Sequence, residues 1–179
     1  MTEETDDALV VRAQSGSRAA LETLVERHYA SIHRVAWRHC GDRTEAEDVA
    51  QEACIRIASA IFGFERRSSF ATWCHGIVLN VARDAVRARA RVKAVAMAMA
   101  TVGADNAGDA DHAGSAEDAL WAAVRALPER QREAVQLVYL EGMSHRDAGR
   151  LIGCAEATVS WHLFAARRAL KSMLGRIER

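Results

Sequence analysis

Aromatic and cationic side chains share one face of the segment between residues 157 and 171. At about 100° of helical rotation per residue, Trp161, Phe164 and Arg168 point in the same direction. Ala157 and Lys171 complete the row. Such side chains on an otherwise exposed face need a partner. Two interpretations stay open here: the face binds DNA, or the segment is part of an ordinary helical hairpin that packs on another domain.

The residues around this face have the pattern of a helix-turn-helix. Ser144 is a good N-cap for a short helix, Asp147 follows three residues later, and Gly153 allows the chain to turn. A longer second helix follows, because its apolar residues recur at helical spacing. They are Val159, Leu163, Ala166, Leu170 and Met173. The second helix of such a motif usually enters the major groove of DNA.

The composition favours an all-helical protein of one ordinary domain or two small ones. Of the 179 residues, 50% are apolar and one is proline, while Ala, Leu, Arg and Glu are frequent. No apolar run approaches the ~20 residues that span a bilayer. The N-terminal segment MTEETDDALVV is acidic and lacks a signal-peptide core. We therefore expect a cytoplasmic protein that does not insert into a membrane.

The formal net charge is zero, but the positive charges are concentrated in two segments. Residues 83–93 contain five cations and one acid, and residues 167–179 again contain five cations and one acid. One basic segment in each half suits a two-part contact with DNA. A solvated helix end can also carry such cations, so the charge pattern only supports the interpretation.

The four cysteines show no metal-binding or redox spacing. Cys40, Cys54, Cys74 and Cys154 contain no CxxC pair, so we expect reduced, structural thiols. The pairs His39-Cys40 and Cys74-His75 could meet as a zinc site, but their spacing matches no metal motif. We expect no metal, no cofactor and no small-molecule substrate.

Helical periodicity and capping residues divide the chain into two domains and a linker. Four helices are expected in residues 1–93: Asp6 to Gln14, Ser17 to Cys40, a third capped by Thr44 with Glu47, and a fourth capped by Ser68 or Ser69. Residues 94–114 are rich in Ala, Gly, Asp and Asn and predict a flexible linker, whose first few residues could extend the fourth helix. Residues 115–179 predict a second four-helix domain, with Pro128 at the first position of one helix and the helix-turn-helix at the end.

Three motifs then resemble those of bacterial sigma factors of the extracytoplasmic-function class. AEDVAQEACIRI (46–57) and SFATWCHGIVLNVARDAVR (69–87) are similar to two signatures of the family's region 2. LPERQREAVQLVYLEGMSHRDAGRLIG (127–153) is similar to the signature of region 4. The resemblance covers nearly all of the chain outside the linker. It implies region 2 in residues 1–93, a flexible linker in 94–114 and region 4 in 115–179.

The resemblance also implies a function and its partners. Sigma factors of this class bind core RNA polymerase, recognise the −10 and −35 promoter elements and help to melt the duplex, without bond-making chemistry. They are typically held inactive by an anti-sigma protein. Core RNA polymerase, promoter DNA and an anti-sigma factor are therefore the expected partners.

The resemblance assigns three groups of site residues. The polar face of the third helix would dock on the polymerase through Asp48, Gln51, Glu52 and Arg56. The loop before the fourth helix and the helix itself would bind the −10 element through Arg66, Arg67, Ser68, Ser69, Asn80, Arg83 and Arg87. The second helix of the helix-turn-helix would bind the −35 element through Glu156, Thr158, Ser160, Trp161, Phe164, Arg167, Arg168 and Lys171.

The sequence departs from the family in the −35-binding helix. Ser160, His162 and Ala165 stand where the family pattern has cations. Fewer phosphate contacts predict weaker binding with a smaller salt dependence. Gly149 also replaces a better helix former, at a cost of roughly 1 kcal/mol.

Other function classes remain to be weighed. A stand-alone helix-turn-helix regulator would bind promoter DNA and ignore core polymerase. An enzyme would need a nucleophile–base pair, a phosphate-binding Gly loop or a metal motif, and none is present in the sequence. A third class is an interaction protein whose cysteines sense oxidant or metal.

Overall fold

The computed structural model describes residues 4–99 and 116–175 of the chain. These residues form helices and turns without a strand, and they divide into two compact units with the boundary between Val95 and Ala96. The prediction of an all-α protein with two small helical domains is confirmed. None of the helices in the described ranges combines the length and hydrophobicity that a bilayer span requires.

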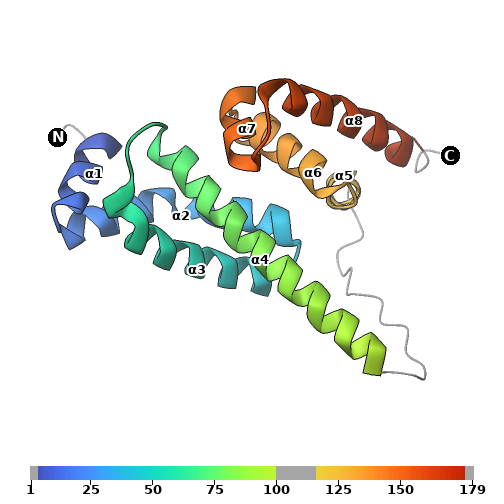
Figure 1. Ribbon diagram of the computed structural model, residues 1–179, viewed down its shortest axis with the longest axis horizontal. Coiled ribbons are helices and arrows are strands. Elements are labelled where there is room, and N and C mark those ends of the chain that lie inside the picture. Colours follow the sequence, from blue (N-terminus) through green and yellow to red (C-terminus); the bar gives the residue numbers. More distant parts are fainter. Residues whose placement is uncertain (1–3, 100–115, 176–179) are drawn as a thin grey trace. The chain divides into compact units, whose positions relative to one another are not determined.

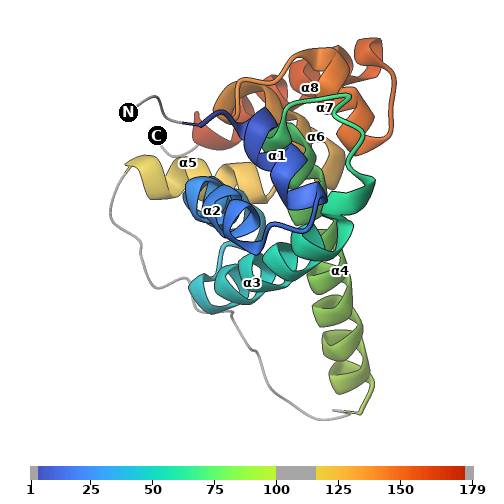
Figure 2. The same cartoon turned by 90° about the vertical axis from the view of Figure 1, so that its left-hand side faces the viewer.

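The first unit contains four α-helices and one short 3₁₀ turn among its described residues. In order, they are α1 (Asp6–Gln14), α2 (Arg18–Cys40), α3 (Arg43–Ala60), η1 (Ile61–Gly63) and α4 (Phe70–Met99). The helices α2 and α3 run side by side, and α4 crosses them and extends beyond them (Figures 1 and 2). Fully buried side chains of three helices form the core, including Leu24, Ile32, Ile57 and Leu79.

Short polar side chains start the helices of this unit, and glycine ends the longest of the first three. Ser17 caps α2, and α2 ends at Gly41, which adopts a left-handed φ of 75°. The prediction that Thr44 caps α3 is wrong. Asp42 is the cap, because its carboxylate accepts a 2.8 Å hydrogen bond from the amide of Glu45 and so starts the helix directly after Gly41.

The helix α4 extends into the expected linker, as the sequence allowed for its first few residues. It continues to Met99, so the first six residues of the expected linker, 94–99, are helical. Alanine and straight-chain residues dominate the sequence after Arg87, and this composition favours continuation of the helix. The remainder of the expected linker, residues 100–114, lies outside the described residues.

The second unit contains α5 (Ala116–Arg125), α6 (Glu129–Val135), the π-helical turn η2 (Gln136–Leu140), α7 (His145–Ile152) and α8 (Glu156–Leu174). Its core combines Leu137, Ile152, Val159, Leu163 and Ala166. Pro128 is the N-cap of α6 and not its first helical residue, one position earlier than predicted. The segment up to Leu140 is not a regular α-helix, because η2 widens the last turn.

The helix-turn-helix is formed by α7 and α8. Ser144 caps α7, and Gly153 ends it with a φ of 72°, as predicted. Gly149, which costs stability inside a helix, is explained by the close approach of the turn. A Cβ at this position would lie 2.7 Å from the carbonyl oxygen of Cys154. The amide of Cys154 donates a 2.9 Å hydrogen bond to the Gly149 carbonyl, so glycine allows the turn to close tightly on α7.

Candidate protein- and nucleic-acid-binding surfaces

The expected docking residues of α3 lie on the side of the helix opposite the core. Asp48, Gln51 and Arg56 are exposed and Glu52 is half-buried, whereas Ala46, Val49, Ala50, Ala53 and Ile57 are buried. The Nε of Arg56 donates a 2.8 Å hydrogen bond to Glu52, one turn earlier. The Nη1 of the same guanidinium lies 3.5 Å from the carboxylate of Asp84 in α4. Arg56 is thus held within the unit, while Asp48 projects an acidic charge into solvent.

Two exposed apolar side chains, one on the polar side of α3 and one in η1, were missed in the sequence. Ile55 is 62% exposed and Phe62 is 65% exposed. Ile55 lies one turn after Gln51 on the polar side of α3, and Phe62 follows seven residues later in η1. The available signal was an apolar residue outside the buried stripe of α3. Apolar side chains surrounded by polar ones are typical of the centre of a protein interface.

Glu47 does not form the capping box that the sequence predicted with Thr44. Its carboxylate accepts hydrogen bonds from the Tyr29 hydroxyl (2.8 Å) and from Gln51 (3.2 Å), and His33 lies 3.4 Å away. The hydrogen bond from Tyr29, followed by that from Gln51, lowers the pKa of Glu47. These contacts join α3 to α2 and orient Gln51 on the docking face.

The loop before α4 is held at its first residues by α1. The side-chain amide of Gln14 donates hydrogen bonds to the carbonyl oxygens of Ile61 (2.9 Å) and Phe64 (2.8 Å). Behind the loop, Phe64 stacks on Trp73 with ring centroids 4.8 Å apart, and Phe70 packs against both rings. The loop therefore starts from a fixed base and lies on an aromatic layer.

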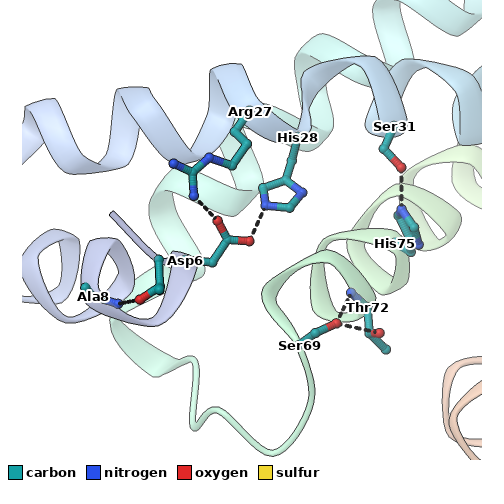
Figure 3. Close-up of polar contacts among 9 residues, drawn as sticks. Asp6, Ala8, Arg27, His28, Ser31, Ser69, Thr72 and His75 are labelled. Carbon is teal, nitrogen blue, oxygen red and sulfur yellow. Dashed lines mark hydrogen bonds and ion pairs between the residues drawn. The ribbon is translucent and has the colours of Figure 1, made fainter. Parts of the chain in front are cut away.

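The loop side chains themselves point outward. Arg66 and Arg67 are exposed, and Arg66 has a φ of 56°, which is uncommon outside glycine. Arg67 pairs with Glu65 at 2.6 Å. Ser69 accepts a 3.1 Å hydrogen bond from the amide of Thr72 and so caps α4, which decides between the two predicted caps (Figure 3). Ser68 is half-buried.

The α4 residues expected to contact DNA share one face. Asn80 and Arg87 are exposed, and Arg83 is half-buried and donates a 3.1 Å hydrogen bond to the Asn80 side chain. On the same stretch of α4, Asp84 lies 3.5 Å from Arg56 of α3. The loop leads into α4, whose exposed residues from Asn80 onward form a second candidate surface of the same unit.

A polar network fixes α1, α2 and α4 behind this surface (Figure 3). Asp6 of α1 binds Arg27 at 2.6 Å and His28 at 2.7 Å, both from α2. Burial acts to raise the pKa of Asp6, but the hydrogen bonds from Arg27 and His28 outweigh it and lower the pKa. Ser31 of α2 lies 2.9 Å from the ring of His75 of α4.

The histidines and cysteines do not assemble into a metal site within the described ranges. No cluster of three His, Cys, Asp or Glu residues there could hold a metal ion. Cys74 is fully buried, and burial raises the pKa of its thiol far above the ordinary value. Burial likewise raises the pKa of Cys54.

In the second unit, α8 presents its aromatic row to solvent. Trp161 and Phe164 are each 59% exposed, and the Arg168 guanidinium lies 6.0 Å from the centre of the Phe164 ring. Lys171 continues the same exposed side one turn later, and Val159 and Leu163 occupy the buried side. The face thus offers apolar, π and cationic contacts together.

Three other candidate residues of α8 have partners inside the unit, and Thr158 is half-buried. Arg167 is hydrogen-bonded to the hydroxyl of Tyr139, and its guanidinium lies 5.4 Å from the centre of that ring. Ser160 is 3.0 Å from the ring of His145, and Glu156 is 3.7 Å from Arg146. The free face therefore centres on Trp161 and Phe164.

Comparisons with known proteins agree over nearly the whole chain. A family model described as Sigma-70 region 2 matches residues 24–92, and one described as Sigma-70, region 4 matches residues 117–170. The RNA polymerase sigma-H factor of Pseudomonas aeruginosa is 32% identical over 97% of this chain and 96% of its own length. The ECF RNA polymerase sigma factor SigM of Mycobacterium tuberculosis is 31% identical over 97% of this chain and 86% of its own length.

Two solved structures have a similar fold. One is CnrH in complex with the cytosolic domain of CnrY, with a TM-score of 0.71 and 24% identity over 97% of this chain and 99% of the other. The second is the sigma factor RpoE bound to the anti-sigma factor NepR from Bartonella quintana, with a TM-score of 0.70 and 22% identity over 88% of this chain and 98% of the other.

Proposed function

Since the chain belongs to the RNA polymerase sigma factors of the sigma-70 family, in their extracytoplasmic-function class, we propose that it binds core RNA polymerase and directs it to two-element promoters. One observation carries the proposal: the chain has three candidate surfaces. The first unit has the acidic face of α3 and, next to it in the chain, the loop with α4. The second unit has the exposed face of the helix-turn-helix. A stand-alone regulator would need only the last of these. The protein acts as an initiation factor and not as an enzyme.

Residues 1–93 dock on the polymerase through α3. Asp48, Gln51, Glu52 and Arg56 supply polar contacts, Ile55 supplies an apolar anchor between them, and Phe62 of η1 adds a second exposed apolar side chain. An acidic rim around apolar anchors suits a basic helical partner surface, because charge orients the encounter and apolar burial provides most of the affinity.

The loop and α4 bind the −10 element. A base that leaves the duplex needs a site with polar edges and nearby cations, and the loop from Phe64 to Ser69 presents two serines and two arginines above an aromatic layer. Asn80, Arg83 and Arg87 then contact the adjoining duplex. Asn can bind base edges, and Arg can bind bases or phosphates.

Residues 115–179 bind the −35 element through α8. Trp161, Phe164, Arg168 and Lys171 are the principal contacts. Three residues have partners inside the unit and therefore position the helix or change partner when DNA binds: Glu156, Ser160 and Arg167. Thr158 lies at the edge of the exposed face. Because the polymerase and the first unit tether this helix near DNA, weak binding by α8 alone is sufficient.

An anti-sigma factor is a further expected partner, and the cytoplasm is the expected location. A structurally similar sigma factor is bound to an anti-sigma factor, and the exposed apolar anchors of α3 and η1 offer a protein-binding surface here as well.

Equilibrium binding to purified core RNA polymerase tests the proposal. Binding with a Kd in the nanomolar range, lost on competition with another sigma factor, supports it. A chain that binds promoter fragments but does not bind core enzyme would be a stand-alone regulator, and the proposal would be wrong.

A further inference from the structure

The first half of α8 carries no cation. Residues 156–164 contain neither Lys nor Arg, and the cations of the helix, Arg167, Arg168 and Lys171, all follow in its second half. In helix-turn-helix proteins the N-terminal residues of the second helix contact the base edges. The commonest specific contact in the major groove, a bidentate Arg or Lys on guanine, is therefore not available in the part of α8 that would read bases.

Two polar side chains in this half of α8 have partners within the unit. Glu156 lies 3.7 Å from Arg146, and the Ser160 hydroxyl lies 3.0 Å from the ring of His145, both on α7. Thr158 is half-buried. The contacts with α7 compete with hydrogen bonds from these side chains to a base, so polar read-out by this half of the helix is weakened.

Apolar side chains form the exposed row of the same half. At about 100° per residue, Ala157, Trp161 and Phe164 lie within an arc of about 60°. All three are exposed, and Trp161 and Phe164 are each 59% exposed. The apolar group that base pairs present in the major groove is the 5-methyl of thymine, and Ala and Phe are among the side chains that contact it.

The cations of the second half suit the DNA backbone. Arg168 lies 6.0 Å from the centre of the Phe164 ring, and Lys171 is exposed one turn later. Arg168 follows Trp161 by about 10 Å along the helix axis, which is about three base-pair steps. Contacts from Arg and Lys to phosphates position a helix on the duplex without reading its sequence. The helix thus separates apolar contacts in its first half from cationic contacts in its second.

From this arrangement we infer that α8 reads its promoter element through thymine methyl groups, with Trp161 and Phe164 as the specificity-determining side chains. The inference rests on the proposed function and names the chemical feature that the −35 surface recognises, an A·T pair whose methyl group lies against an aromatic ring. Burial of a methyl group favours thymine over bases that lack it, and no polar contact is needed for this discrimination.

Uracil substitution in the −35 element tests the inference, because uracil pairs as thymine does and lacks only the 5-methyl group. The probe is holoenzyme binding to a promoter fragment mapped by run-off transcription with core polymerase and this protein. Uracil at one or more thymines of the element should lower the wild-type affinity about fourfold, as expected for one buried methyl group. At each such thymine, Trp161→Ala or Phe164→Ala should bind both fragments equally. Removing the guanine N7 acceptor with 7-deazaguanine should lower the affinity by less than about twofold.

Lys171→Gln is the matched control, since it removes a charge from the same exposed side and keeps both rings. It should weaken binding of both fragments by the same factor and retain the preference for thymine. The inference would be overturned by equal wild-type affinity for both fragments, by an element without A·T pairs, or by a larger loss with 7-deazaguanine than with uracil. A preference that persists in both ring variants would also overturn it, because another side chain would then contact the methyl group. Failure of the wild-type holoenzyme to start transcription would instead reject the proposed function.

Discussion

Gln14 holds the carbonyl oxygen of Phe64 by a 2.8 Å hydrogen bond from its side-chain amide, and so connects α1 to the start of the loop that precedes α4. The same amide donates to Ile61, so one side chain satisfies two carbonyls. The loop assigned to base capture is thereby attached to an element 50 residues away in the chain.

Replacing Gln14 with Met keeps the length of the side chain and removes both hydrogen bonds. We expect a loss of about 1–2 kcal/mol in the free energy of unfolding, because two carbonyls lose their donor. Promoter opening, followed by permanganate reactivity of unpaired thymines, should fall more than core binding. Core binding reduced to the same extent as opening would show that Gln14 supports the whole unit and not the loop.

Asp48→Lys should weaken binding to core polymerase by about tenfold or more, since a positive charge would face a basic partner surface. Binding of the −35 element by the free protein, through α8, should be unchanged. Glu22→Lys is the matched control. It changes the same charge on an exposed part of α2 and breaks only the pair with Arg18. Equal losses in both variants would mean that net charge and not the α3 face determines the affinity.

Trp161→Ala should reduce holoenzyme affinity for the −35 element by about tenfold, because truncating a large aromatic anchor at an interface costs more than about 1 kcal/mol. Arg168→Ala should act in the same direction. Leu120→Ala serves as control, since Leu120 is an apolar residue of the same unit that is also exposed, at 40%. Core binding should be unaffected in all three. A Trp161 variant with normal promoter affinity would remove this side chain from the DNA surface.

Asp6→Asn should make the first unit less stable at neutral pH and less sensitive to acid. The folded-state pKa of Asp6 lies below its ordinary value of 3.8, so its contribution is complete above about pH 5 and is lost as the pH falls through the folded-state pKa. Thermal unfolding between about pH 3 and 7 measures this. Asp7→Asn, in the same first turn of α1, should retain the wild-type acid sensitivity. The same pH profile in both variants would contradict the role of the Arg27 and His28 contacts.

Cys74 should not react with N-ethylmaleimide at pH 7 until the protein unfolds, because the thiol is buried and its pKa is raised by that burial. Cys40, Cys54 and Cys154 are partly exposed. Replacing these three with Ser should leave transcription unchanged with and without peroxide. A peroxide response that disappears in this variant would support the alternative of a cysteine sensor.

The sequence predicted the helices well because their ends depend on local chemistry. The α2 limits follow from Ser17 and Gly41, and the α7 limits follow from Ser144 and Gly153. The errors arise where contacts outside the local segment decide. Glu47, for example, binds Tyr29 of another helix and not the start of its own.

The sequence predicted which side of α8 is exposed, but not which of its polar side chains have partners within the unit. The exposed side of α8 follows from periodicity alone, because Val159 and Leu163 fix the buried side. The partners of Arg167 and Ser160 could not be predicted, since Tyr139 and His145 lie far away in sequence. Ile55 was missed because one apolar residue on a polar face carries little weight without the structure.

Run-off transcription tests the central claim most directly. Core RNA polymerase is combined with this protein on fragments of the source genome, and the start sites are mapped. The account predicts discrete start sites that depend on the protein and share two spaced upstream elements, with loss of these transcripts for Asp48→Lys and Trp161→Ala. Transcripts identical to those of core enzyme alone, in the presence of a folded protein that still binds DNA, would contradict it.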